Sequence, residues 1–245
     1  MILAIARREW LACFQTPLAW LLLAASQVVL AWIFLNVLDD FAGLASSDRG
    51  GGINLALVQN LFGSAAVLML LAAPPLAARA LSSERREGTD QLVGAAPVEL
   101  AAVVLGKFLG LALPLLLLSL LPLGLGLTLL GVAPIDPGLF LAATLGLWLA
   151  GLMFCAAGLF AASLTAQPAL AVVIAYGILV TLSVLNRVER IAAETVSLFE
   201  WLAWNQHLFW FLTGVVRLSD LLYFAGMSAL FLALTQRRLA NQRLG

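Results

Sequence analysis

The chain has 245 residues, of which 63% are hydrophobic and 11% are charged, and its mean hydropathy is +1.04. Soluble globular domains carry about a quarter of charged residues, so this composition excludes that class and indicates an integral membrane protein. The formal net charge is zero, and without a clustered positive charge we also exclude nucleic acid as a partner.

The first sixteen residues, MILAIARREWLACFQT, are predicted to form an elbow helix in the membrane interface. Apolar side chains recur at helical spacing, and Arg7, Arg8 and Glu9 fall largely on another face. Pro17 then bends the chain into the first span. The apolar run that follows is longer than the roughly 7 to 15 residues of a signal peptide, so we expect it to be a retained span.

Six segments are apolar and long enough to cross about 30 Å of hydrocarbon as helices. The third is over-long and contains Pro114 and Pro122, so we expect part of it to project or kink. The last is the weakest by length. The six segments are residues 17–38, 54–78, 100–131, 138–164, 168–185 and 218–236.

With six spans both termini lie on one side, and the basic residues then separate clearly. By the positive-inside rule, the side richer in Lys and Arg is cytoplasmic. The other side carries Arg49, Arg187, Arg190 and Arg217. Nine of the thirteen basic residues share the predicted cytoplasmic side: Arg7, Arg8, Arg79, Arg85, Arg86, Lys107, Arg237, Arg238 and Arg243.

Polar side chains are sparse within the spans. Asn54, Gln59, Asn60 and Ser119 are candidates for lining a polar pathway, although hydrogen bonding between helices is the favoured interpretation. The span centres carry no charge, which argues against a proton-coupled carrier. Small residues through 142–163 allow close helix approach and mark a packing or dimer face.

The sequence shows no pattern for catalysis or metal binding. Gly106-Lys107 is followed by Phe108, whereas a phosphate-binding loop needs Ser or Thr there, so we expect no ATP hydrolysis by this chain. His207 is the single histidine, and a packing role is favoured over a ligand role. Cys13 and Cys155 have no pairing pattern and are interpreted as small apolar residues.

A dense polar stretch, residues 79–99, separates the second and third spans. Gly88 is predicted to end one helix, Thr89 to cap a short helix presenting Gln91 and Leu92, and Pro97 to begin the next span. A short exposed helix of this kind could dock in a groove of a soluble partner. On the residues alone, a solvated loop is slightly favoured.

Residues 187–213 are expected to form one or two short external helices before the last span.

The polar stretch resembles the type-2 ABC-transporter permeases of the gliding-motility and multicopper-maturation type. These permeases share a Glu-Arg-Arg-x-Gly-Thr-x-x-x-Leu segment followed by Pro-Val and Leu-Gly-Lys. The likeness extends to residues 7–9, 158–165 and 214–224, although Arg217 stands where relatives often have an acidic residue. The counterparts here are Pro75, Arg79, Glu84, Arg85, Arg86, Gly88, Thr89, Leu92, Pro97, Val98, Leu105, Gly106 and Lys107.

The resemblance implies a single permease domain over residues 1–245, with an elbow helix (1–16), a cytoplasmic coupling region (79–99) and external helices (187–213). The fold class is then an all-α integral membrane protein with six transmembrane helices. Such a permease pairs with a second copy or a related permease in the bacterial inner membrane, both termini cytoplasmic. An auxiliary external protein is a further candidate partner.

The implied function is ATP-driven export of a substrate or lipid, with ATP and Mg bound by two copies of a separate cytosolic ATPase and no cofactor bound by this chain. The elbow helix, with Arg7, Arg8 and Glu9, and Lys107 would brace the contact with the ATPase. An ATP-independent channel or scramblase, and a structural membrane anchor of a complex, remain alternatives. The implied ATPase-coupling residues are Glu84, Arg85, Arg86, Gly88, Thr89, Gln91, Leu92, Pro97 and Lys107.

Overall fold

The computed structural model describes residues 2–43, 53–86, 100–130, 135–189 and 201–244. Over these ranges the chain forms helices and no β-strand, which confirms the predicted all-α fold class. The elements are α1 (Ile2–Phe14), α2 (Pro17–Gly43), α3 (Ile53–Leu57), the π-helix η2 (Val58–Phe62), α4 (Gly63–Arg86), α6 (Leu100–Leu127), α7 (Pro137–Leu164), α8 (Pro168–Glu189), α10 (Trp204–Leu212) and α11 (Leu218–Leu244).

Among the described residues, six helical stretches are long and apolar enough to cross a membrane, as predicted. Two bounds differ from the expectation. The third span ends at Leu127 and stays one helix through Pro114 and Pro122. The last span is not short, because α11 continues through Arg, Gln, Ala and Leu residues that favour helix well past the apolar part.

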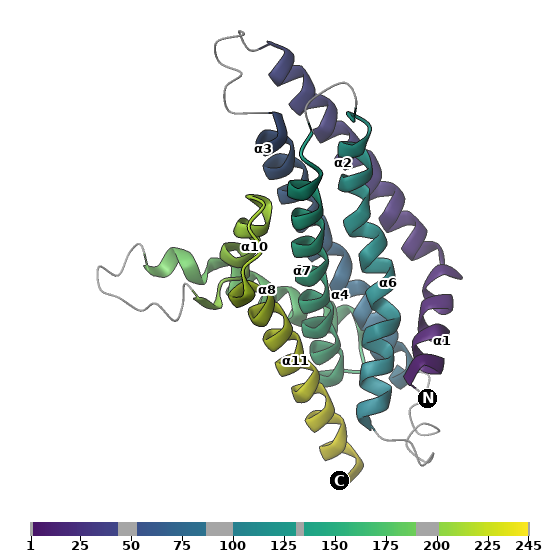
Figure 1. Ribbon diagram of the computed structural model, residues 1–245. Coiled ribbons are helices and arrows are strands. Elements are labelled where there is room, and N and C mark those ends of the chain that lie inside the picture. Colours follow the sequence, from purple (N-terminus) through teal and green to yellow (C-terminus); the bar gives the residue numbers. More distant parts are fainter. Residues whose placement is uncertain (1, 44–52, 87–99, 131–134, 190–200, 245) are drawn as a thin grey trace.

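Both termini lie at the same end of the bundle, where α1 lies beside the first turns of α6 (Figure 1). We call this the terminal end, and the opposite end, with α3 and the start of α7, the far end. At the far end, α3 is linked to the start of α7 by a hydrogen bond. The backbone amide of Asp136 donates to Asn54 Oδ1 at 3.4 Å. Asp136 also caps α7 through its side chain.

Helix α7 is the most buried of the six spans, and its glycines set how closely its neighbours approach. A Cβ atom built on Gly146 would lie 2.4 Å from Phe211 Cβ of α10, and one on Gly158 would lie 2.7 Å from Ala77 Cβ of α4. The small residues of 142–163 therefore form a packing face within the chain.

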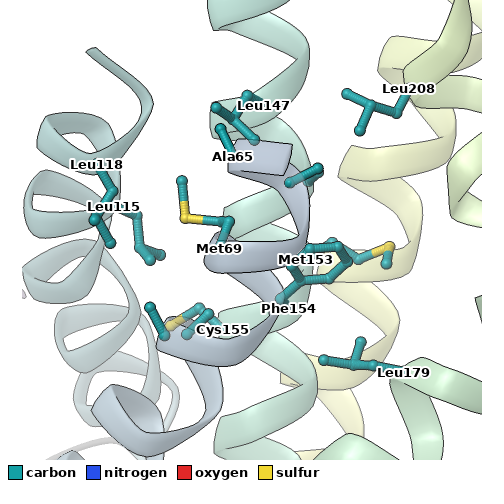
Figure 2. Close-up of a cluster of buried hydrophobic side chains, with 14 of the residues drawn as sticks. Ala65, Met69, Leu115, Leu118, Leu147, Met153, Phe154, Cys155, Leu179 and Leu208 are labelled. Carbon is teal, nitrogen blue, oxygen red and sulfur yellow. The ribbon is translucent and has the colours of Figure 1, made fainter. Parts of the chain in front are cut away.

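The core forms around α7 from side chains of several helices (Figure 2). Met69 of α4 points toward Leu115 of α6, and Phe154 of α7 belongs to the same buried cluster. Trp204, the first residue of α10, packs edge-on against Phe154 with ring centroids 4.9 Å apart. Helix α10 thus begins deep in the bundle and runs to the far end, where Gly214 lies beside Leu139.

The outermost spans are α2 and α8, which are the least buried of the six spans. On α2, Trp20 and Trp32 are 60% and 67% exposed, and their neighbours on the surface are apolar. Exposed apolar side chains at this density suit a lipid-facing surface.

A π-helix, η2, interrupts the second span and was not anticipated from the sequence. It carries Gln59 and Asn60, both exposed, while Leu61 and Phe62 are fully buried. π-Helical turns are rare and occur frequently at functional sites. The span continues as α4 through Pro74 and Pro75, so these prolines do not end it.

Replacing Gly158 with alanine is expected to destabilise the bundle. The new methyl group would meet Ala77 Cβ and the Pro74 backbone, neither of which can rotate away. Overpacking of this kind costs about 1–3 kcal/mol, which thermal unfolding in detergent will show as a lowered midpoint. Gly177→Ala is the matched control, because nothing lies within 4 Å of a Cβ there. Equal midpoints for the two variants would contradict the close α4–α7 contact.

Candidate functional site: a buried joint at the terminal end

Two glycines one helical turn apart let α1 lie directly on α6. A Cβ on Gly106 would approach Ile5 Cβ to 2.7 Å, and one on Gly110 would approach Glu9 Cβ to 2.6 Å and the Ala6 carbonyl oxygen to 2.8 Å. No side chain therefore fits at either position without moving α1. The sequence places Lys107 beside this glycine pair, on the buried side of α6.

Lys107 is 2% exposed and holds three elements together. Its ammonium group donates to Glu9 Oε1 of α1 at 2.9 Å and to the backbone carbonyl of Ala80 in α4. Glu9 is itself buried and also accepts from the exposed Arg8 at 3.0 Å. A buried charge needs a partner and further hydrogen bonds, and this arrangement supplies both. We call Glu9, Ala80 and Lys107 the joint.

The bend between α1 and α2 is bonded to α4 as well. Arg79 donates to the Thr16 hydroxyl, which in turn donates to the Cys13 carbonyl at 2.9 Å. Trp20 Nε1 closes the bend by donating to the Phe14 carbonyl at 2.9 Å. Burial raises the pKa of the Cys13 thiol, with Arg79 opposing the shift, so Cys13 is a packed thiol with little thiolate character.

The orientation of α1 differs from the expectation in one respect. Arg7 and Arg8 are exposed, as predicted, but Glu9 faces inward with Cys13. The apolar side chains Leu3 and Leu11 are exposed instead. The Glu9 carboxylate faces α6 because it accepts a hydrogen bond from Lys107 there. The exposed Leu3 and Leu11 side chains can then contact lipid.

The residues predicted to couple to an ATPase lie next to the joint in sequence. Glu84, Arg85 and Arg86 occupy the end of α4, and the positions of their side chains lie outside the described part. The predicted short helix, with Gly88, Thr89, Gln91, Leu92 and Pro97, also lies outside the described residues. The joint binds both helices that lead into this region, since Ala80 lies near the end of α4 and Lys107 near the start of α6.

The four candidate pathway residues do not come together. Asn54 accepts from the Asp136 amide at the far end, and Asn60 Nδ2 donates to the Ala56 carbonyl of its own helix at 2.9 Å. Ser119 is fully buried and donates to the Leu116 carbonyl at 2.7 Å. Gln59 and Asn60 alone share one exposed site, on η2.

A second buried polar cluster, which the sequence analysis missed, lies on α10 and α11. His207 Nδ1 is 2.7 Å from Asp220 Oδ1, and both side chains are buried. The packing role expected for His207 is therefore combined with a buried hydrogen bond to Asp220. An acidic residue at the start of an apolar span, thirteen positions after the single histidine, was the available signal. Over the described ranges, no group of three or more His, Cys, Asp or Glu residues could hold a metal ion.

Removing the Lys107 charge is expected to destabilise the protein strongly. Lys107→Met leaves Glu9 buried with only the exposed Arg8 beside it, and breaking a buried ion pair costs about 3 kcal/mol. The Glu9→Leu/Lys107→Met double variant removes both charges and should recover most of the loss, as chemical unfolding will measure.

Arg8→Ala is the matched control for this measurement. Its side chain is 64% exposed, so its loss should cost less than about 1 kcal/mol. A double variant no more stable than Lys107→Met would contradict the ion-pair interpretation.

Comparison with known protein families gives one clear match. Residues 3–239 match the family described as "ABC-2 family transporter protein". No curated protein matches the chain. The family match spans nearly the whole sequence, and six membrane-spanning helices among the described residues agree with it. The chain therefore belongs to the ABC-2 transporter family, as the membrane permease component of such a transporter.

Proposed function

We propose that this permease couples a separate cytosolic ATPase to the export of a substrate or lipid, and that residues 79–99 are the contact with that ATPase. ABC permeases generally pair with ATPase subunits, and the match found here is to a permease domain, with no nucleotide-binding domain found in the chain. ATP and Mg would then be bound by the partner. Nothing in this assignment requires a cofactor on the permease itself.

The observation that carries the proposal is the joint. A coupling segment transmits force only if the helices on both sides of it move as one body. Lys107 connects α6 to α4 through the Ala80 carbonyl and to α1 through Glu9, all by buried polar contacts. Displacement of residues 87–99 would therefore move α1, α4 and α6 together, instead of being absorbed by one helix.

Within the contact, each proposed residue has a distinct role. Glu84, Arg85 and Arg86 would pair with charged groups of the ATPase, and Gly88, Thr89 and Pro97 would shape the short helix that presents Gln91 and Leu92. Arg7 and Arg8 are exposed on α1 and would support the same partner or anionic headgroups. This assignment rests on the family motif and on the position of α4, which leads directly into the segment.

The exposed amides of η2 support a two-permease assembly with a polar pathway. Gln59 and Asn60 are exposed within a stretch long and apolar enough to span the membrane. Facing lipid, the Gln59 amide would lose its water hydrogen bonds without replacement. A second permease copy, or a related one, facing this site across a hydrated pathway would satisfy both side chains.

The remaining features of the assembly follow the same family reasoning. We place the protein in the bacterial inner membrane with both termini cytoplasmic, because the basic residues of the terminal end then obey the positive-inside rule. The gliding-motility and multicopper-maturation subgroup and two ATPase copies per assembly are parts of the proposal that the resemblance of residues 79–107 favours. An auxiliary external protein is a further candidate partner.

Charge reversal at the contact tests the coupling role. Glu84→Arg with Arg86→Glu should reduce ATPase binding or ATP turnover by roughly tenfold or more, as expected when like charges replace a few favourable pairs. The measurement is copurification with the ATPase and ATP hydrolysis in nanodiscs. Arg237→Glu with Arg238→Glu is the control, since this exposed pair lies at the terminal end on α11. Unchanged assembly and unchanged turnover in the first variant would eliminate the coupling assignment.

The channel or scramblase alternative makes a different prediction. The purified chain, reconstituted without an ATPase, should then move lipid or small solutes across liposomes. We expect no such flux, because the described spans pack closely around α7 and the proposed pathway needs a second copy and ATP-driven closure. Flux at the same rate with and without the ATPase would favour the alternative.

Substitution of the exposed amides tests the pathway. Gln59→Leu with Asn60→Leu should lower transport about tenfold while leaving ATPase binding intact, since the changes lie away from the joint. Val67→Leu, at an exposed apolar position of the same span, is the control. Full transport in the double variant would remove the pathway role and favour the structural-anchor alternative.

A further inference from the structure

A recess of ≈ 280 Å³ lies where α10 meets the start of α11. This volume is at the lower end of the range for small-molecule sites, so the recess suits a small polar group and not a drug-sized ligand. The side chains that line it are chemically mixed, with aromatic rings, an amide, a cation, a hydroxyl and a carboxyl group. They include Trp201, Gln206, Trp210, Arg217, Ser219 and Asp220.

One side of the recess suits an anion. Arg217 is exposed, and its guanidinium carbon lies 3.2 Å from the centroid of the Trp210 ring. This stacking uses the flat face of the guanidinium and leaves the N–H groups on its edge available. Such an edge matches a phosphate group, which can accept two parallel hydrogen bonds from it. Arg217 is thus a cation held in place beside the recess.

The start of α11 adds to this preference. The backbone N–H groups of Asp220 and Leu221 both donate to the Arg217 carbonyl at 3.2 Å. The amides before them, of Leu218 and Ser219, begin the helix and have no acceptor within it, as at every helix N-terminus. Together with the helix dipole, they favour a negative group next to Ser219. A phosphate is therefore the chemistry expected for one half of a ligand.

A buried oxygen of Asp220 calls for a different group. Asp220 is 3% exposed, and its Oδ1 lies 2.7 Å from His207 Nδ1. Its Oδ2 is buried too, and among the described residues it has no hydrogen-bond partner. A carboxyl oxygen accepts hydrogen bonds, and leaving a buried acceptor without a donor is unfavourable. A ligand that brings an N–H or O–H group to Oδ2 would remove this penalty.

We infer that the recess binds the headgroup of a phospholipid that carries both a phosphate and a hydrogen-bond donor, such as the amine of ethanolamine or a hydroxyl of glycerol. The phosphate would lie against Arg217 and the start of α11, and the donor would reach Asp220 Oδ2. The inference is independent of the proposed ATPase contact, which lies at the terminal end.

The surroundings of the recess favour a lipid over a soluble phosphate ester. Val215, Val216 and Leu218 flank Arg217 and are exposed, as is Leu222 one turn further along α11. Residues 218–242 are long and apolar enough to span the membrane, so the recess lies where one span begins. Lipid headgroups gather at this boundary, and tryptophans such as Trp201 and Trp210 are enriched there. The exposed apolar side chains could then contact the acyl chains of the bound lipid.

A series of headgroups tests the donor. The full-length protein, purified in detergent, is mixed with phospholipids of identical acyl chains, and bound lipid is measured by native mass spectrometry. Ethanolamine, N,N-dimethylethanolamine and choline headgroups each carry a phosphate and a positive charge, but choline has no N–H group. We expect the first two, and glycerol, to bind about tenfold more strongly than choline, because they supply a buried acceptor with its donor. Equal binding of choline would overturn the inference.

Arg217→Gln tests the phosphate contact. It should lower binding of the ethanolamine lipid about tenfold, because a charge-assisted pair is lost, and Arg217→Lys should restore part of the binding. Arg237→Gln is the matched control, since it removes an exposed arginine from the other end of α11. Unchanged binding in Arg217→Gln, or an equal loss in both glutamine variants, would contradict the site.

Two further measurements separate the alternatives. Asp220→Ala should bring the ratio of ethanolamine to choline binding close to one, and a ratio as high as in the wild type would contradict the Oδ2 contact. If thermal unfolding shows that this variant does not fold, the headgroup series on the wild type decides. Glycerophosphoethanolamine, which has no acyl chains, should compete only weakly. Competition as strong as that of the lipid would overturn the lipid assignment.

Discussion

Close contact between helices is the constraint on which the whole structure depends. Lipid tails are as apolar as leucine, so burial from water does not drive helices together within a bilayer, and contact must come from packing and hydrogen bonds. Gly146 and Gly158 provide it by admitting Phe211 and Ala77 at distances that no larger residue allows. Helix α7 can therefore serve as the common surface for α4, α6, α8, α10 and α11.

The same principle explains why ionisable side chains are buried at only a few places in the described bundle. Lys107 is stabilised by a carboxylate and a carbonyl from two other helices, and His207 by a carboxylate and a carbonyl in the opposite half. The Lys107–Glu9 contact joins residues 98 positions apart, whereas the His207 contacts join residues 13 and 6 positions apart. The two differ in exposure, because the histidine pair borders a recess and Lys107 is enclosed by α1, α4 and α6.

Much of the fold could be predicted from residue patterns, because length and hydropathy determine which helices can span a bilayer. The contacts could not. Lys107 was counted as a topology charge and, from the resemblance, as an ATPase-coupling residue, but its pairing with Glu9 was not predicted, because no local pattern pairs residues so far apart. The π-helix at Val58–Phe62 left no composition signal, and Asp220 was missed because its partner precedes it on another helix. The predicted coupling helix, by contrast, depended on a family motif, because its local pattern slightly favoured a solvated loop.

The joint also sets an order for biosynthesis. Glu9 and Lys107 are separated by 98 residues, so at about 5–20 residues per second the ribosome needs roughly 5 to 20 seconds to deliver the partner of the elbow carboxylate. During that interval α1 can rest on the bilayer surface with Arg8 beside Glu9, an ion pair that persists in the finished protein at 3.0 Å. Docking of α1 then becomes the step that closes the first half of the bundle, after the third span has entered the membrane.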